Sequence, residues 1–186
     1  MTDLGPMLPS ALAPSTTLRL THNSRVYELP LCRATFLPFP DTHGLDTFGG
    51  KDMLKVDGKA QFAEVAILRA FEADGWLGRW MEPYGRSRMN PALLRAWNGG
   101  PFKTQEHLPI ADGWVNERLH RIAVANRQSY SGCWDVVAWK GERLVFAESK
   151  KRKKDRIRGT QLRWLEAALS CACAMEDFLV VEWSLT

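Results

Sequence analysis

An aspartate, a glutamate and a lysine lie close together in a segment that has the pattern of a β-hairpin. Residues 132–150 form two arms rich in Val, Trp, Phe and Leu, separated by a turn that contains Gly141, as in two paired antiparallel strands. If the chain reverses directly after Gly141, Asp135 lies opposite Glu148, with the two Cβ atoms roughly 4.5 to 5.5 Å apart. Lys150 points to the same face as Glu148, because side chains alternate along a strand. The hairpin is therefore expected to gather an acidic pair and an ammonium group in one patch.

This patch has the groups needed for metal-dependent hydrolysis of a phosphate ester. Two carboxylates this close repel each other unless a proton or a cation lies between them. The oxygens of Asp135 and Glu148 suit Mg²⁺ or Mn²⁺, which bind through one or two carboxylates together with waters and phosphate oxygens. Such an ion lowers the pKa of a bound water and neutralises charge that develops on the phosphate. The alternative is a structural ion network, since a Glu-x-Lys pair on a strand also occurs by chance.

A strongly basic run follows the hairpin directly. The formal net charge of the chain is +4, and between Lys150 and Arg158 there are seven Lys or Arg residues and a single acid, Asp155. This run focuses positive potential beside the acidic pair. Such a run is often only a solvated loop, but beside a phosphate-cutting site it would follow a nucleic-acid backbone. The candidate contacts are Lys151, Arg152, Lys153, Lys154, Arg156 and Arg158.

A helix and a strand that precede the hairpin are predicted to support the patch. Residues 59–74 carry apolar side chains at helical spacing, and Gly75 is a suitable stop. Glu64 lies at the edge of the apolar stripe, where a carboxylate usually needs a salt bridge, a backbone contact or a metal. Residues 76–81 then have the composition of a strand.

A second helix and a last strand follow the basic run. Residues 158–175 have an apolar helical face with Gln161 in the first turn, and residues 178–183 are the nearly continuous apolar run expected of a strand covered on both faces. Without the N-terminal part and one insertion, the order is helix, three strands, helix and strand. This order predicts an α/β or α+β fold with a mixed central sheet flanked by helices.

The remaining segments extend and interrupt this core. Residues 1–17 are expected to be a flexible lead-in, a short hairpin is predicted between about Leu18 and Leu29, and residues 31–58 are expected to be a long loop. At 186 residues the chain is expected to be one domain. Its parts are an N-terminal extension, 1–58, a core, 59–81 and 132–183, and an insertion, 86–131, with short helices predicted at 91–97 and 114–128.

Cysteine usage and hydropathy exclude some classes of protein. Cys32, Cys133, Cys171 and Cys173 have neither the spacing of a disulfide framework nor that of a zinc ribbon. Cys171 and Cys173 lie in a small-residue helix end, where free cysteines behave as buried apolar groups; a metal pair is the alternative. No window approaches the ~20 apolar residues of a membrane span. We therefore expect a cytoplasmic protein that has no membrane partner, in a reducing compartment.

The spacing of these residues resembles the signature of a known superfamily. Asp135, twelve intervening residues and Glu148-Ser149-Lys150 are similar to the D…(D/E)-x-K signature of the PD-(D/E)XK nucleases. The restriction-endonuclease-like αβββαβ core of that superfamily is also similar to the order of elements read here. More narrowly, the chain resembles the VRR-type nucleases, in the pattern Gly132-x-x-Asp135-Val136, Glu148-x-Lys150, Asp155-Arg156-Ile157 and Gln161-x-x-Trp164-Leu165.

The resemblance implies roles for individual residues. It implies a Mg²⁺ or Mn²⁺ ion held by Asp135, Glu148, the main-chain carbonyl of Ser149 and Glu64. Lys150 would hold the attacking water or stabilise the developing negative charge, and Gln161 would orient Lys150 or the phosphate. There are two departures from the pattern: Trp134 replaces the usual proline before the aspartate, and Arg158 replaces a small hydroxyl residue at the helix start. The second departure makes Thr160 the expected N-cap.

The function that the resemblance implies is metal-dependent endonuclease activity on DNA, with branched DNA as one substrate class. Without a base-reading motif, shape and backbone contacts would provide the specificity. Cutting a four-way junction would need two sites, which makes a homodimer the expected assembly, although the sequence indicates no dimer face. Two alternatives remain: a nuclease that cuts RNA or single strands under control of an effector or partner, and a nucleic-acid-binding module without cleavage.

Overall fold

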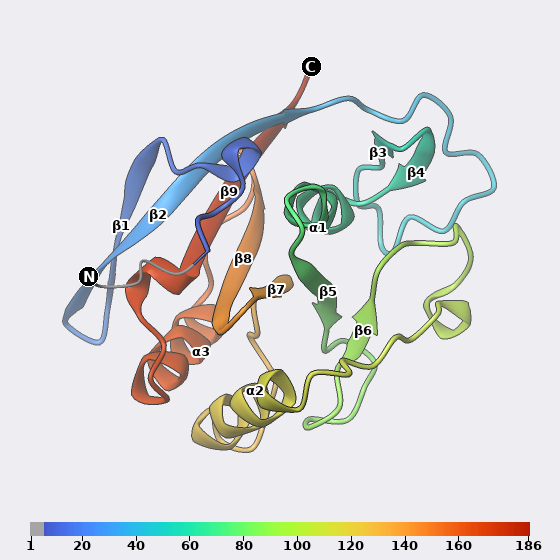
Figure 1. Ribbon diagram of the computed structural model, residues 1–186. Helices are drawn as coiled ribbons and strands as arrows, with labels where there is room; N and C mark the ends of the chain where they lie inside the picture. Colours follow the sequence, from blue (N-terminus) through green and yellow to red (C-terminus); the bar gives the residue numbers. More distant parts are fainter. Residues whose placement is uncertain (1–5) are drawn as a thin grey trace.

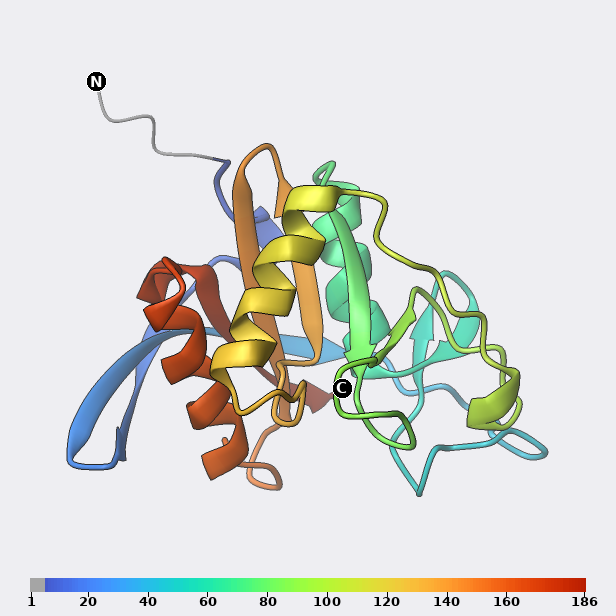
Figure 2. The same cartoon turned by 90° about the horizontal axis from the view of Figure 1, so that it is seen from below.

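A mixed seven-stranded sheet lies between helices on its two faces. The computed structural model describes residues 6–186 (Figure 1), so the first five residues of the predicted lead-in lie outside the described part. The strand order is β1-β2-β9-β8-β7-β5-β6. Helix α1 (Ala63–Ala73) packs on one face, and α2 (Gly113–Ala125) and α3 (Gly159–Ser170) pack on the other (Figure 2). The predicted α/β class with a mixed central sheet and flanking helices is confirmed.

The predicted hairpin forms the middle of the sheet. Strand β7 (Val136–Lys140) pairs antiparallel with β8 (Arg143–Lys151), and Val136 faces Ala147. This is the predicted register, and it leaves Gly141 and Glu142 as a two-residue turn. Gly141 has φ of +57°, which a glycine adopts without steric cost in such turns.

The strands on either side of the hairpin also follow the prediction. Strand β5 (Leu77–Glu82) pairs antiparallel with β7, and β9 (Phe178–Leu185) pairs parallel with β8. In β9 the residues Phe178 and Val180 pack on the side of α2 and α3, while Leu179 and Val181 pack on the side of α1. Burial on both faces explains why this strand is a continuous apolar run.

Both predicted core helices are shorter than expected. Residues 59–61, placed at the start of the first helix, instead form β4 (Lys59–Gln61), which pairs with β3 (Leu54–Val56). The cause is a tight turn at Asp57-Gly58, where both residues have positive φ (+49° and +76°), a dipeptide that favours hairpins. The second helix ends at Ser170 instead of Met175, and Ala172, with φ of +65°, reverses the chain after it.

The insertion contains one correct and one wrong prediction. Helix α2 lies within the predicted range 114–128, apart from its first residue. The helix predicted at 91–97 is wrong, because β6 (Ala92–Leu94) pairs antiparallel with β5 at the sheet edge. Ala92 and Leu94 are buried there, so tertiary pairing overrides the local helix-start signal.

The N-terminal hairpin is longer than predicted and joins the central sheet. Strand β1 (Thr16–His22) pairs antiparallel with β2 (Arg25–Phe36), and β2 continues as a parallel neighbour of β9. The predicted loop at 31–58 is therefore wrong at both ends and shrinks to about residues 37–53. Single-turn 3₁₀ helices complete the described elements, at Ser10–Leu12, Phe102–Thr104 and Met175–Asp177.

The four cysteines are free thiols. Cys173 is buried, as predicted, whereas Cys171 is only partly buried. Across residues 6–186, no helix has both the length and the apolar composition to cross a membrane.

Candidate active site

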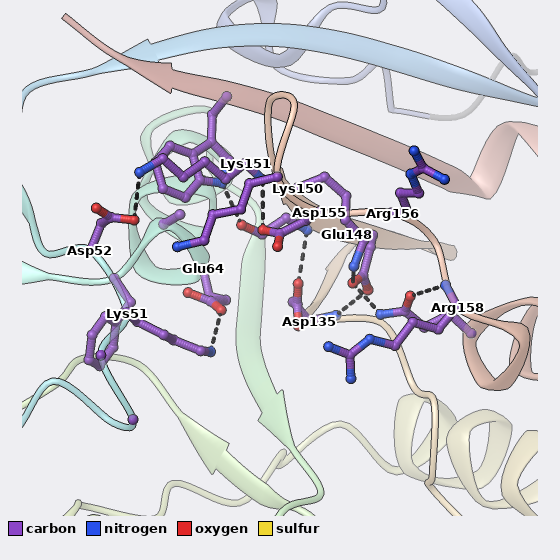
Figure 3. A pocket seen from close by; sticks show the side chains of 18 residues that line it. Lys51, Asp52, Glu64, Asp135, Glu148, Lys150, Lys151, Asp155, Arg156 and Arg158 are labelled. Carbon is purple, nitrogen blue, oxygen red and sulfur yellow. Dashed lines mark hydrogen bonds and ion pairs between the residues drawn. The ribbon is translucent and has the colours of Figure 1, made fainter.

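All the predicted catalytic and metal-binding residues line one pocket of about 650 Å³ (Figure 3). Asp135, directly before β7, and Glu148 and Lys150, on β8, form one wall of it. Glu64 comes from the first turn of α1 and Gln161 from the first turn of α3. The pocket therefore lies where the hairpin meets the N-terminal ends of two helices on opposite faces of the sheet.

The acidic pair is held by hydrogen bonds across the hairpin. The Asp135 N–H donates to Oε2 of Glu148 at 3.2 Å, and the Ser149 N–H donates to Oδ2 of Asp135 at 2.9 Å. Glu148 is only 1% exposed. Burial, the larger effect, and repulsion from Glu148 together raise the pKa of Asp135 well above its usual value. Burial also raises the pKa of Glu148, although Lys150 partly opposes that effect. Asp135 itself is partly buried, and two neighbouring carboxylates in this relation favour a proton or a cation between them.

Lys150 and Gln161 contact the same oxygen of the pair. The Lys150 ammonium donates to Oε1 of Glu148 at 2.7 Å, and the Gln161 amide also donates to that oxygen. The side-chain oxygen Oε1 of Gln161 accepts the Arg158 N–H at 2.8 Å. Gln161 thus joins the start of α3 to the glutamate and touches Glu148 directly. The N-cap of α3 is Arg158, so the expectation of Thr160 is wrong. The Gln161 side chain accepts the N–H of this N-cap residue, as the third helical residue does in a capping box.

A glycine lets the start of α3 approach the hairpin closely. Gly132 has φ of +79°, and a Cβ added there would lie 2.1 Å from the carbonyl oxygen of Thr160. The indole N–H of Trp134 donates to the main-chain carbonyl oxygen of Gln161 at 3.3 Å. Gly132 and Trp134 therefore set the distance between α3 and Asp135, and Trp134 has a structural role at the position of the usual proline.

Glu64 is paired with a lysine that the sequence did not suggest. Its carboxylate is 2.8 Å from the ammonium of Lys51, and its side chain is 8% exposed. Lys51 lies in the loop between β2 and β3. Burial lowers the pKa of Lys51, but attraction to Glu64, Asp135 and Glu82 outweighs that effect and raises it overall. Lys51 is therefore a charged ammonium at the acidic side of the pocket.

Four of the six predicted basic contacts lie at the pocket. Lys151, Lys154, Arg156 and Arg158 line it. Arg152 and Lys153 are not among its lining residues; Arg152 is 3.8 Å from Glu182, and Lys153 lies in a turn with φ of +63°.

The donor set at the acidic pair fits a hard divalent ion. In residues 6–186 no three Asp, Glu, His or Cys side chains converge closely enough to enclose a metal by themselves. Mg²⁺ does not require such a cage, because it keeps several waters and binds proteins through one or two carboxylates. Asp135 and Glu148 would provide these carboxylates. Glu64, the third predicted acidic ligand, is paired with Lys51 instead.

Two residues at the pocket were not predicted from the sequence. Lys51 and Asp52 follow Gly49-Gly50 in a segment without periodicity, and Asp52 forms a 2.8 Å ion pair with Lys151. No local signal marks either residue, since their position depends on contacts with distant parts of the chain.

Comparison with protein-family models, with curated proteins and with solved structures finds no match for this chain.

Proposed function

We propose that this protein is a metal-dependent nuclease that hydrolyses phosphodiester bonds in DNA. The observation that carries the proposal is the pair of the partly buried Asp135 and the buried Glu148, linked across a hairpin and sharing one pocket with Lys150 and Gln161. A purely structural ion network would not need two neighbouring carboxylates whose pKa values are both raised. A cation bound between them would remove this repulsion.

The arrangement of elements supports a restriction-endonuclease-like core. The helix α1, the strands β5, β7 and β8, the helix α3 and the strand β9 follow one another in the αβββαβ order, apart from the insertion after β5. The sheet is mixed, because β8 and β9 are parallel and the other core pairs are antiparallel. Together with the Gly132, Asp135, Glu148, Lys150 and Gln161 pattern, this supports a relationship to VRR-type nucleases.

The residues divide the work of hydrolysis as follows. A bound Mg²⁺ or Mn²⁺ would supply an activated water and neutralise charge on the phosphate. Asp135 and Glu148 would hold that ion, and the main-chain carbonyl of Ser149 would be a further ligand. Lys150 holds the attacking water or stabilises the negative charge that develops on the phosphate oxygens. Gln161 keeps the Glu148 carboxylate in place through its bond to Oε1.

The rim of the pocket suits a phosphate backbone. Lys154, Arg156 and Arg158 lie beside the acidic pair, and cations in this position bind phosphates by displacing counterions from the nucleic acid. They carry no base-reading pattern, so the proposal assigns recognition to backbone shape. Junction cutting would then require two copies of the chain, and a homodimer remains a prediction.

The test is cleavage by purified protein of labelled single-stranded, duplex, flapped and four-way-junction DNA, with matched RNA. We expect cleavage of DNA in Mg²⁺ or Mn²⁺ and none with a chelator. Glu148→Gln should reduce the rate by about 10²- to 10³-fold. Glu142→Gln is the matched control, because Glu142 is exposed in the turn of the same hairpin.

For the lysine, the substitution Lys150→Met is compared with Lys153→Met, since Lys153 is exposed and outside the pocket. Undiminished cleavage by Glu148→Gln, or cleavage that persists in chelator, would refute the proposal. Cleavage of RNA but not of DNA would keep the metal chemistry and reassign the substrate. Salt-sensitive DNA binding without any cleavage would favour the binding-module alternative.

A further inference from the structure

Lys51 is a partly buried cation of the pocket that the proposed chemistry does not use. Its ammonium is 2.8 Å from Oε1 of Glu64. The same nitrogen lies over three aromatic rings, 5.2 Å from the centroid of Phe48, 5.8 Å from that of Phe62 and 5.5 Å from that of Trp80. Each of these contacts stabilises a positive charge. The surroundings of Lys51 are therefore those of a cation site, and the protein fills it with its own side chain.

Packing against the insertion holds this side chain in place. Phe48 stacks on Phe102, with ring centroids 5.3 Å apart, and packs against Trp97 at 5.4 Å. The Lys51 N–H donates to the Thr47 carbonyl oxygen at 2.9 Å. The insertion thus anchors the loop that delivers Lys51 to the pocket, so the ammonium position is set before any substrate binds.

The balance of charge around the pocket suggests what this ammonium replaces. Lys51 is attracted to Glu64, Asp135 and Glu82, in that order of strength. Glu64, Asp135 and Glu148 line the pocket, and Glu82, which does not line it, interacts with both Lys51 and Glu148. Together with Lys51 and Lys150 they form a group of four carboxylates and two ammonium groups. The formal charge of this group is −2, which one divalent ion neutralises. Without Lys51 it would be −3, and Glu64 would be free to bind a further ion.

We propose that Lys51 is a built-in second cation of the site. Its ammonium occupies the position beside Glu64 that a second divalent ion would otherwise take, so the chain binds a single ion, at Asp135 and Glu148. The inference rests on the proposed function, because it assumes that the acidic pair binds a divalent ion. It assigns Glu64 to holding Lys51 and assigns the loop and the insertion to positioning it.

The number of bound Mn²⁺ ions tests this proposal without any measurement of activity. Isothermal titration of the full chain with Mn²⁺ should give one ion for the wild type and two for Lys51→Met. Lys51→Arg keeps the positive charge and should give one ion. Lys55→Met is the matched control, because Lys55 is exposed four residues further along the same segment, and it should also give one ion. If Lys51→Met does not fold, as judged by circular dichroism, Lys51→Gln replaces it with the same expectation.

Three results would overturn the proposal. The first is that the wild type binds two ions, and the second is that Lys51→Met binds one ion with unchanged affinity. The third is that Lys51→Arg binds the same number of ions as Lys51→Met. The first two would mean that the ammonium does not exclude an ion, and the third would mean that its charge is not what matters. Failure of the proposed function gives a different pattern, in which the wild type binds no Mn²⁺ and Glu148→Gln changes nothing.

Discussion

Gly132→Ala tests how closely α3 must approach the acidic pair. The added Cβ would lie 2.1 Å from the carbonyl oxygen and 2.4 Å from the carbonyl carbon of Thr160. These atoms are helix backbone and cannot rotate away. The positive φ of this position, +79°, costs a non-glycine residue about 1 to 2 kcal/mol, and overpacking adds about 1 to 3 kcal/mol. We therefore expect the free energy of unfolding to fall by about 2 to 5 kcal/mol.

Gly141→Ala separates the two parts of this cost. Gly141 also has a positive φ, +57°, but a Cβ there would meet only Pro6 Cγ at 3.8 Å, an ordinary contact. Urea unfolding of the two variants, followed by circular dichroism, should show a loss of about 1 to 2 kcal/mol for Gly141→Ala and a clearly larger loss for Gly132→Ala. Folded Gly132→Ala should also cleave more slowly, because Gln161 moves with the helix. Equal losses for both variants would refute the close-packing argument.

Three further predictions concern the charged and ionisable groups. Lys154→Met should reduce the slope of log K against log salt for DNA binding by about 1, whereas Lys153→Met, outside the pocket, should leave the slope unchanged. Equal slopes for the two variants would contradict the proposed phosphate contact of Lys154. The raised pKa of Asp135 means that its contribution to stability is fully present below its unfolded pKa, near 3.8, and is lost as pH rises through the folded value. Urea unfolding in chelator should therefore show the free energy of unfolding falling as the pH rises above about 4. The fall should be less steep in Asp135→Asn, and less steep in the wild type when Mn²⁺ is added. Identical pH profiles for the wild type and Asp135→Asn would be inconsistent with this. Burial raises the pKa of Cys173 to about 11, so iodoacetamide should modify the partly buried Cys171 before Cys173. Peptide mass spectrometry measures the two rates of modification, and equal rates would contradict this prediction.

The hairpin could be predicted because short-range rules determine it. A two-residue turn and the period of two along each strand leave a single register, and that register places Asp135 against Glu148. Gln161 was predictable as a first-turn residue of a helix with a clear apolar face. Its contact with Glu148 was not, because it depends on how α3 packs against Gly132.

The errors in the prediction arose where long-range pairing decides the structure. Residues 92–94 follow a helix-start signal, yet they pair with the edge of β5 as a strand of the sheet. Residues 59–61 are continuous with the helical pattern that follows them, but the turn at Asp57-Gly58 pairs them with β3. Lys51 could not have been placed from the sequence, since its position follows from the stacking of Phe48 on Phe102, fifty-four residues away in the chain.

The most direct measurement is a crystal structure with Mn²⁺, read by its anomalous signal. We expect one peak in the pocket, in contact with Asp135 and Glu148, with Lys51 still beside Glu64. The peak should be absent from a crystal of Glu148→Gln soaked in the same way. A pocket without a peak, at a Mn²⁺ concentration that saturates any cleavage activity, would contradict the metal-dependent mechanism.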